Sequence, residues 1–368
     1  MVNVRGVARL GMLAAGLGVG AAVAHSPVAS ADPSTDWLSS IDSFVGSSAL
    51  PAPSSGLDLA ISFDGYSLVH EGSASAYTNS GDYSLAIADG DDSSAYAGGT
   101  GDSAFADGDG ATASADGGTG NDALADGTNA YASAGGDTGD TSATHDTAID
   151  IGNNDLPSTG YSDGAFAGNA DLVGNPSGGT GADDTAIDIG NNTNDASLGG
   201  GGNDGSFAGA GGLTGGSGDG NNDTAIDVGD NSGLSDGSEA VAGNGNFASE
   251  SGSTTGEYEG AEAIYGNDNT AVADTSYTTD GVADLAGFGN DNYASVLGPE
   301  NSFASAEGGD SNVAFVVDPF GSTDSYAETY GSNSDLAAVL FTDGNAYVLN
   351  APDVYDILTA FGPETGMF

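Results

Sequence analysis

Carboxylates are the only chemically versatile side chains that this sequence offers in quantity. The 368 residues include 54 Asp and Glu, three His, no Cys and only two basic side chains, Arg5 and Arg9. Because no Lys or Arg follows residue 9, the chain lacks the cations that bind nucleic acid or an anionic membrane surface. The absence of Cys excludes thiolate zinc sites and thiol nucleophiles. Clustered carboxylate oxygens favour a hard cation such as Ca²⁺.

Two pairs of aspartates recur within a tandem of nine-residue blocks: Asp89 with Asp107, and Asp91 with Asp109. The blocks cover residues 80–125, each a Gly/Asp turn followed by x-A-Φ-A, where Φ is usually large and apolar, and the members of each pair lie two blocks apart. Two blocks per coil of a β-solenoid would stack such residues at a rise of about 4.8 Å. The paired carboxylates are therefore expected to lie one above another.

Such stacked carboxylates would repel each other by about 3 kcal/mol at an effective dielectric of 20. Calcium ions held by the carboxylates and by turn carbonyls would relieve this repulsion, so the sequence predicts a calcium-stabilised solenoid. The alternative is that these aspartates point into water and only make the solenoid soluble.

The blocks GGTGDSAFA and GGTGNDALA resemble the nonapeptides of repeat-in-toxin (RTX) proteins, with the pattern G-G-x-G-x-D-x-U-x. The resemblance implies a calcium-loaded parallel β-roll. Residues 117–125 match the whole pattern, while residues 178–183 and 199–204 match its first six positions. By this resemblance, the calcium-binding aspartates are Asp122, Asp183 and Asp204. The blocks that begin at residues 89, 98 and 107 depart from the family, because Ser or Thr replaces the calcium-binding Asp.

The pattern also predicts which side chains face the core. We expect Ile87, Tyr96, Phe105 and Leu124 to point inward and the alanines beside them to point outward, because the larger apolar side chains gain more from burial. Beyond residue 140, T-A-I-D segments begin at Thr147, Thr185 and Thr224, with a degenerate copy at Thr270. This period of about 40 residues predicts repeat units of two coils, each about 20 residues long.

The expected fold class is all-β, a parallel β-roll or β-solenoid with small α+β caps at both ends. Residues 1–31 have the features of a signal peptide: two Arg, an uncharged run and an A-x-A cleavage site. Residues 32–79 should form an N-terminal cap with a short helix from Asp36 and a hairpin at Asp64-Gly65. Residues 80–310 should form the solenoid. Residues 311–368 should form a C-terminal cap, with a hairpin over 336–349 and a helix from Asp353 to Phe361.

These features predict a secreted or cell-surface protein, and the leader resembles those of exported mycobacterial proteins. The overall Gly-rich bias is similar to that of mycobacterial Gly-rich repeat proteins. We expect a structural or adhesin-like role rather than an enzyme, with calcium ions and a component of the cell envelope or host surface as partners, no nucleic acid and no membrane span. The alternative is a β-solenoid enzyme acting on extracellular polysaccharide. An ice-binding row of threonines is not expected, because the T-A-I-D threonines are widely separated in the sequence.

Overall fold

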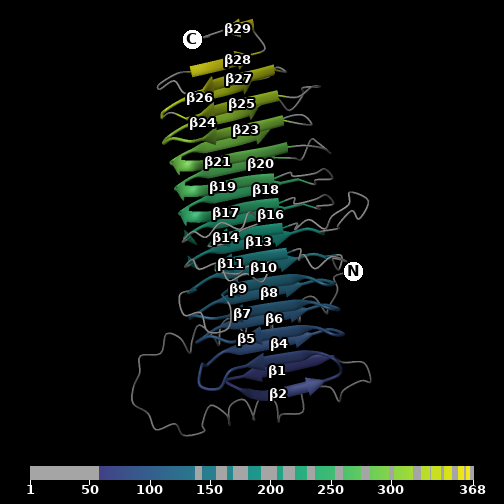
Figure 1. Ribbon diagram of the computed structural model, residues 1–368. Helices are drawn as coiled ribbons and strands as arrows, with labels where there is room; N and C mark the ends of the chain where they lie inside the picture. Colours follow the sequence, from purple (N-terminus) through teal and green to yellow (C-terminus); the bar gives the residue numbers. More distant parts are fainter. Residues whose placement is uncertain are drawn as a thin grey trace, which may run out of the picture.

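The protein is a rod built from two parallel β-sheets. The computed structural model describes residues 58–136, 143–154, 164–168, 181–191, 205–209, 220–229, 237–252, 260–274, 282–297, 302–317, 325–331, 333–340, 344–349, 355–359 and 362–364. These residues form 29 strands and no helix, stacked from β2 at one end to β29 at the other (Figure 1). The expected leader and the helix from Asp36 lie outside the described residues.

The first sheet, called sheet A, has 15 strands. In spatial order they are β2 (Tyr66–Glu71), β1 (Leu59–Phe63), β4 (Leu85–Asp89), β6 (Ser103–Asp107), β8 (Asp122–Asp126), β10 (Thr147–Ile151), β13 (Thr185–Ile189), β16 (Thr224–Val228), β18 (Phe247–Ser251), β20 (Thr270–Asp274), β22 (Tyr293–Leu297), β24 (Val313–Val317), β26 (Leu336–Leu340), β28 (Tyr355–Thr359) and β29 (Gly362–Glu364).

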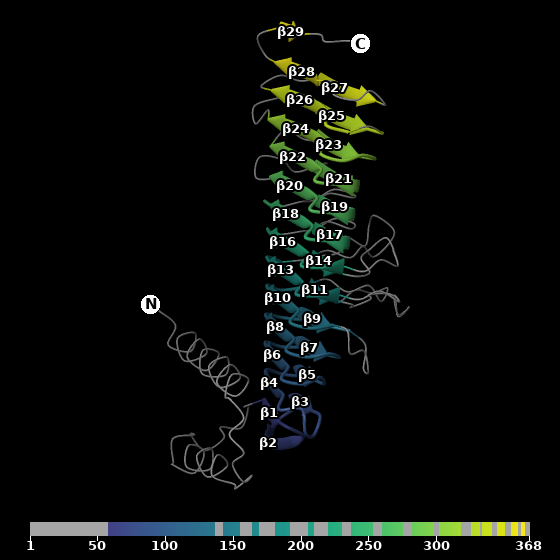
Figure 2. The ribbon, with the colours of Figure 1, turned by 90° about the vertical axis from the view of Figure 1, so that its left-hand side faces the viewer.

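The second sheet, called sheet B, has 14 strands and packs against one face of sheet A, as Figure 2 shows. They are β3 (Ser75–Thr78), β5 (Ser94–Ala97), β7 (Thr112–Asp116), β9 (Tyr131–Gly135), β11 (Gly164–Gly168), β14 (Gly205–Gly209), β17 (Gly237–Asn244), β19 (Gly260–Asn267), β21 (Val282–Asn290), β23 (Ser302–Glu307), β25 (Ser325–Tyr330) and β27 (Gly344–Leu349), with the two-residue strands β12 (Gly181–Ala182) and β15 (Gly220–Asn221) beside them.

The chain alternates between the sheets, so that each coil contributes one strand to each. In the nonapeptide region a coil is two blocks long, because Asp89 of β4 lies in parallel register with Asp107 of β6. The next coil is one residue longer and places Asp126 beside Asp107. The expected parallel β-solenoid with two nonapeptides per coil is therefore confirmed.

The predicted hairpin at the N-terminal end is also confirmed. Strands β1 and β2 pair antiparallel, with Phe63 opposite Tyr66. Asp64 and Gly65 form the two-residue turn, with φ of 48° and 81°, the left-handed conformation that an Asp-Gly hairpin turn requires. Strand β1 then pairs antiparallel with β4, so the hairpin covers the first parallel strand of sheet A.

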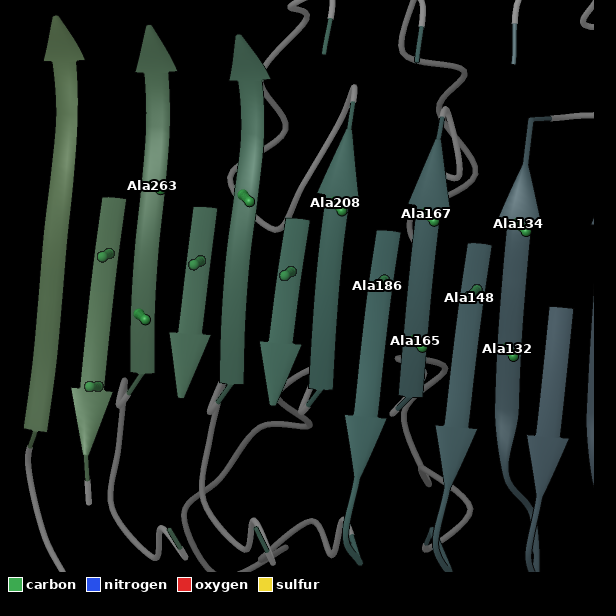
Figure 3. Packing of buried hydrophobic residues seen from close by; sticks show 14 of the residues in the cluster. Ala132, Ala134, Ala148, Ala165, Ala167, Ala186, Ala208 and Ala263 are labelled. Atoms are coloured by element: carbon green, nitrogen blue, oxygen red, sulfur yellow. The ribbon is translucent and has the colours of Figure 1, made fainter. Parts of the chain in front are cut away.

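The interior between the sheets is lined by alanine, and the expected inward and outward faces are reversed. Ala86 and Ala88 are fully buried, whereas Ile87 between them lies on the outer face and is only half-buried. Figure 3 shows the alanine side chains between overlapping strands of the two sheets. Methyl groups of buried alanines fill the space between the sheets. The period of two fixes the alternation of side chains, but not which set faces inward.

The remaining three large side chains of the nonapeptides also lie outside. Phe105 and Leu124 stack in register on the outer face of sheet A, and Tyr96 stacks on Tyr77 outside sheet B with ring centroids 5.4 Å apart. Phe105 is nonetheless only 8% exposed. Large apolar residues therefore pack along the outside of the rod instead of filling it.

The T-A-I-D segments do not mark units of two coils throughout. Thr147 pairs directly with Thr185, and Thr185 with Thr224, so each of these two steps is a single coil. The additional residues lie between strands, largely outside the described residues. The next step, from Thr224 to Thr270, spans two coils, because β18 lies between β16 and β20. Insertions between strands change the sequence period without changing the register of the sheet.

The C-terminal hairpin and helix are wrong predictions. Strand β26 pairs in parallel with β24 and β28, whereas β27 belongs to sheet B and pairs with β25. The segment expected to be helical, 353–361, contains β28, which continues sheet A. Just after it, β29 pairs antiparallel with β28. The edge of β26 offers backbone hydrogen-bonding groups to the next segment of the chain. Pairing with this edge favours a strand at 355–359, although the apolar residues there are spaced as in a helix.

A ladder of buried Asn and Asp side chains runs along one corner of sheet A. In each coil the side-chain Oδ1 of the residue just before the strand accepts a hydrogen bond from the backbone N–H of its counterpart in the next coil, at 2.8–3.1 Å. Ser84 begins this inner ladder by accepting from the N–H of Asp102. Its members are Asp102, Asn121, Asp146, Asp184, Asp223, Asn246, Asn269, Asn292, Asn312 and Asp335.

Glycines at the opposite corner of sheet A let successive coils approach closely. Gly108 and Gly127 have φ of 138° and 147°, which only glycine adopts readily. A β-carbon on Gly127 would overlap the carbonyl oxygen of Gly152 in the next coil. The Asp-Gly turns of the repeat are therefore required by backbone approach as well as by turn geometry.

Candidate functional site

The first predicted calcium corner is assembled as a row of single carboxylates. Asp89, Asp107 and Asp126 end consecutive strands of sheet A and lie in register. Neighbouring parallel strands are about 4.8 Å apart, so adjacent carboxylates can share a cation. The described residues nevertheless contain no group of three or more His, Cys, Asp or Glu side chains arranged to hold one metal ion.

The second predicted pair is also brought together, but its oxygens accept hydrogen bonds from the protein. Asp91 Oδ1 accepts from the Ser73 hydroxyl at 2.6 Å, and Asp109 Oδ1 accepts from the backbone N–H of Asp91 at 3.4 Å. These contacts join the turn of one coil to the turn of the next. Asp91 and Asp109 thus contribute to turn pairing.

The aspartates assigned by the RTX resemblance do not gather with these pairs. Asp122 begins β8 beside Ser103 and Thr147, and burial raises its pKa, while a hydrogen bond with Ser103 opposes that effect. Asp183 has a left-handed φ of 59°, and its Oδ1 lies 3.5 Å from Nδ1 of His145 on the surface. Asp204 lies outside the described residues.

A different set of acids lies inside the rod, where sequence reasoning did not place them. On three consecutive coils the inner row of sheet A is Asp-Ala-Asp, and on the fourth it is Asn-Ala-Glu. We call its acidic members the acid strip. All are 0% exposed: Asp146, Asp150, Asp184, Asp188, Asp223, Asp227 and Glu250. One feature of the sequence could have indicated this burial. The Asp of T-A-I-D lies two residues after the Ala, so in a strand the two side chains point to the same face of the sheet.

Burial changes the acidity of the inner ladder. The pKa of Asp184 is raised to about 9: burial is the main cause, the N–H of Asp223 opposes it, and the carboxyls of Asp146, Asp223 and Asp183 add to it. Burial also raises the pKa of Asp223 to about 8 and that of Asp102 to about 7. These groups therefore hold protons at a pH at which exposed aspartates are ionised.

The outer face of sheet A carries an uncovered row of apolar side chains. Ile149, Ile187 and Ile226 lie in register on β10, β13 and β16. Beside them Ile151, Ile189 and Val228 are 38%, 41% and 42% exposed. Sheet B packs on the opposite face, and no third layer of described strands covers this one. The row continues toward β4 through Leu124, Phe105 and Ile87. Toward β24 the same column contains Ser249, Val272, Ser295 and Phe315.

The threonines of the T-A-I-D segments also lie on this face, and the argument that they are too sparse is wrong. Thr147, Thr185 and Thr224 occupy adjacent strands despite their separation in sequence. Phe247 interrupts the row before Thr270. The row is therefore regular, but only three threonines long.

Neither the described structure nor the comparisons identify a family. Among the described residues, no helix has the length and apolar character needed to cross a membrane. Sheet A and sheet B establish a parallel β-solenoid of repeated strands. No protein-family model, no curated protein and no solved structure matches the chain.

Proposed function

We propose that this protein is an exported structural or interaction protein, adhesin-like in its role, that binds a component of the cell envelope or host surface. The supporting observation is the uncovered apolar row on the outer face of sheet A. Contiguous apolar surface of this kind marks interaction sites in soluble proteins. The rod holds Ile151, Ile189 and Val228 in register on adjacent strands, so a partner would meet them as one flat surface.

The test replaces the most exposed apolar side chains of this face. A triple variant with Ile151, Ile189 and Val228 changed to Glu should reduce adsorption to intact cells or envelope fragments at least tenfold. The matched control is Tyr347→Glu, because Tyr347 is 44% exposed but belongs to sheet B. Circular dichroism must show that both variants keep the strand content of the parent. Equal adsorption of the parent and the triple variant would exclude this face as the contact surface.

Calcium stabilisation of the RTX type is a further part of this proposal, centred on the corner formed by Asp89, Asp107 and Asp126. Each coil supplies one carboxylate there, so a bound Ca²⁺ would complete its shell with turn carbonyls and water. Calcium should then raise the melting temperature more than NaCl of equal ionic strength, which only screens charge. The double variant Asp89→Asn with Asp107→Asn should lose that difference, and an equal effect of both salts on the parent would contradict the proposal.

A second candidate function is binding to an ordered lattice such as ice. The row of Thr147, Thr185 and Thr224 beside a row of isoleucines favours it, because hydroxyl and methyl groups repeat at the strand spacing of about 4.8 Å. Inhibition of ice recrystallisation that is lost in Thr185→Asn would support this function.

The polysaccharide-enzyme alternative instead predicts the release of reducing ends from an extracellular glycan.

A further inference from the structure

The acid strip is a built feature of the middle of the rod. Its seven carboxyl groups occupy two columns of the inner face of sheet A. One column belongs to the inner ladder and contains Asp146, Asp184 and Asp223. The other contains Asp150, Asp188, Asp227 and Glu250, which pair in register on β10, β13, β16 and β18. In the nonapeptide coils Ala88, Ala106 and Ala125 occupy the second column.

Sheet B provides space for these acids with glycine. A β-carbon on Gly168 would meet Asp146 Oδ2, and one on Gly209 would meet Asp184 Oδ2. At the other column, a β-carbon on Gly164 would lie 2.9 Å from Asp150 Oδ2. Strands β11 and β14 therefore begin and end with glycine where sheet A carries acids. Larger residues at these positions would exclude the carboxyl groups.

Like charges surround Asp184, the central member of the ladder column. Asp146 and Asp223 adjoin it on the neighbouring coils, and Asp183 precedes it in the chain. His145 is the titratable base nearby, but it pairs with Asp183 on the surface. On sheet B, the uncharged Gly209 lies against Asp184 Oδ2. The chain has no Lys, and its only Arg residues are Arg5 and Arg9.

Asp223 has a similar environment with one difference. Its neighbours in the column are Asp184 and the neutral Asn246, whose N–H donates to Asp223 Oδ1 at 2.8 Å. The second oxygens, Oδ2 of Asp184 and Oδ2 of Asp223, are buried and accept no hydrogen bond within the described residues. An ionised carboxylate needs donors or cations around both oxygens when it is buried. A neutral carboxyl group satisfies this environment better.

We propose that the acid strip is protonated in the folded rod, so that the coils from β10 to β18 form a segment that is stable in acid and loosens as the pH rises. The buried positions of Asp184 and Asp223, with pKa values raised to about 9 and about 8, support this proposal. Protons thus perform in the interior the task that calcium was expected to perform outside.

The sign of the effect follows from proton counting. In the unfolded chain an Asp has a pKa of about 3.9, so it is ionised above about pH 5. The folded form keeps the protons of Asp184 and Asp223 up to about pH 7. Unfolding therefore releases the protons of these two groups between these limits, and they alone should raise its equilibrium constant about 100-fold for each pH unit; the other acids of the strip add to this slope. The stabilisation is complete below about pH 4 and is lost as the pH rises through the folded-state values.

The test compares the full chain with the double variant Asp184→Asn and Asp223→Asn. Asparagine fits the ladder, because Asn246 and Asn269 occupy the same column and keep the same Oδ1 contact. Both proteins are unfolded in urea at several pH values between 5 and 7. For each pH unit, the unfolding equilibrium constant of the variant should rise about 100-fold less than that of the parent. The matched control is Asp291→Asn, an exposed residue outside the coils of the strip, which should leave the dependence unchanged.

Infrared spectroscopy gives a second readout that does not depend on the variant folding. The folded parent at pH 6 should show the C=O stretching band of protonated carboxyl groups, which should weaken on unfolding and in the double variant. The proposal is wrong if the parent shows no such band at pH 6, or if the double variant keeps the parent's pH dependence. It is also wrong if the stability of the parent increases with pH, or if EDTA destabilises the parent but not the double variant, because the strip would then hold a cation.

Discussion

Replacing Asn269 with alanine should destabilise the rod far more than replacing Asn267, although the two residues belong to the same coil. Asn269 is fully buried in the inner ladder. Its Oδ1 accepts from the N–H of Asn292 at 3.1 Å, and its Nδ2 donates to the carbonyl of Gly289 at 3.0 Å. Alanine would leave both backbone groups without these partners. Each unsatisfied buried group costs about 1–3 kcal/mol, so we expect a loss of about 2–6 kcal/mol.

Asn267 is the matched control because it belongs to a second, exposed ladder of asparagines. Its Nδ2 donates to Asn290 Oδ1 at 2.8 Å, and its Oδ1 accepts from Asn244 Nδ2 at 2.9 Å. Water can replace both partners there, so Asn267→Ala should cost no more than about 1 kcal/mol. Two of these hydrogen bonds are lost in each variant, but the partners of Asn269 are buried or partly buried backbone groups and those of Asn267 are exposed side-chain amides.

The assay is urea unfolding followed by far-UV circular dichroism at one fixed pH. Stability changes can be compared only if the slope against urea concentration stays the same, because a changed slope indicates a partly unfolded rod. Equal destabilisation by the two substitutions would refute the view that burial makes the inner ladder strong. A larger effect of Asn267→Ala would mean that the exposed ladder is the stronger one.

Two other substitutions test the close approach of coils and of sheets. Gly127→Ala should destabilise by about 2 kcal/mol or more, because φ is 147° and the added methyl group would overlap the Gly152 carbonyl; a thermal melt unchanged from the parent would contradict this. Ala186→Leu should destabilise by about 1–3 kcal/mol through overpacking, since Ala186 is fully buried between the sheets. Ile187→Leu, on the outer face of the same strand, should change stability by less than about 1 kcal/mol. Equal destabilisation by Ala186→Leu and Ile187→Leu would place residue 187 inside.

The coil and its register could be predicted because they depend on local features. Asp-Gly turns recur at fixed offsets, and a spacing of two nonapeptides stacks Asp89 on Asp107. The turn at Asp64-Gly65 was predictable for the same reason, since two residues alone determine it. Where insertions separate Thr147 from Thr185, sequence distance no longer measures spatial distance.

The inner and outer faces could not be predicted from the pattern. Burying larger side chains is usually favourable, and this rule placed Ile87 inside and Ala86 outside. The distance between the sheets decides the matter instead, and it depends on the turns of the whole coil. Extended to the T-A-I-D segments, the same rule would place Ile149 inside and Asp150 in the solvent, and it would therefore miss the acid strip.

Thiol labelling tests most directly the central claim that alanine lines the interior and larger apolar side chains form the outer face. The chain has no Cys, so a single introduced thiol reports one position. Ile187→Cys should react with a maleimide in the native protein. Ala186→Cys, its neighbour on β13, should react only after unfolding. Rapid labelling of native Ala186→Cys, with protection of Ile187→Cys, would contradict both the fold described and the interaction face proposed from it.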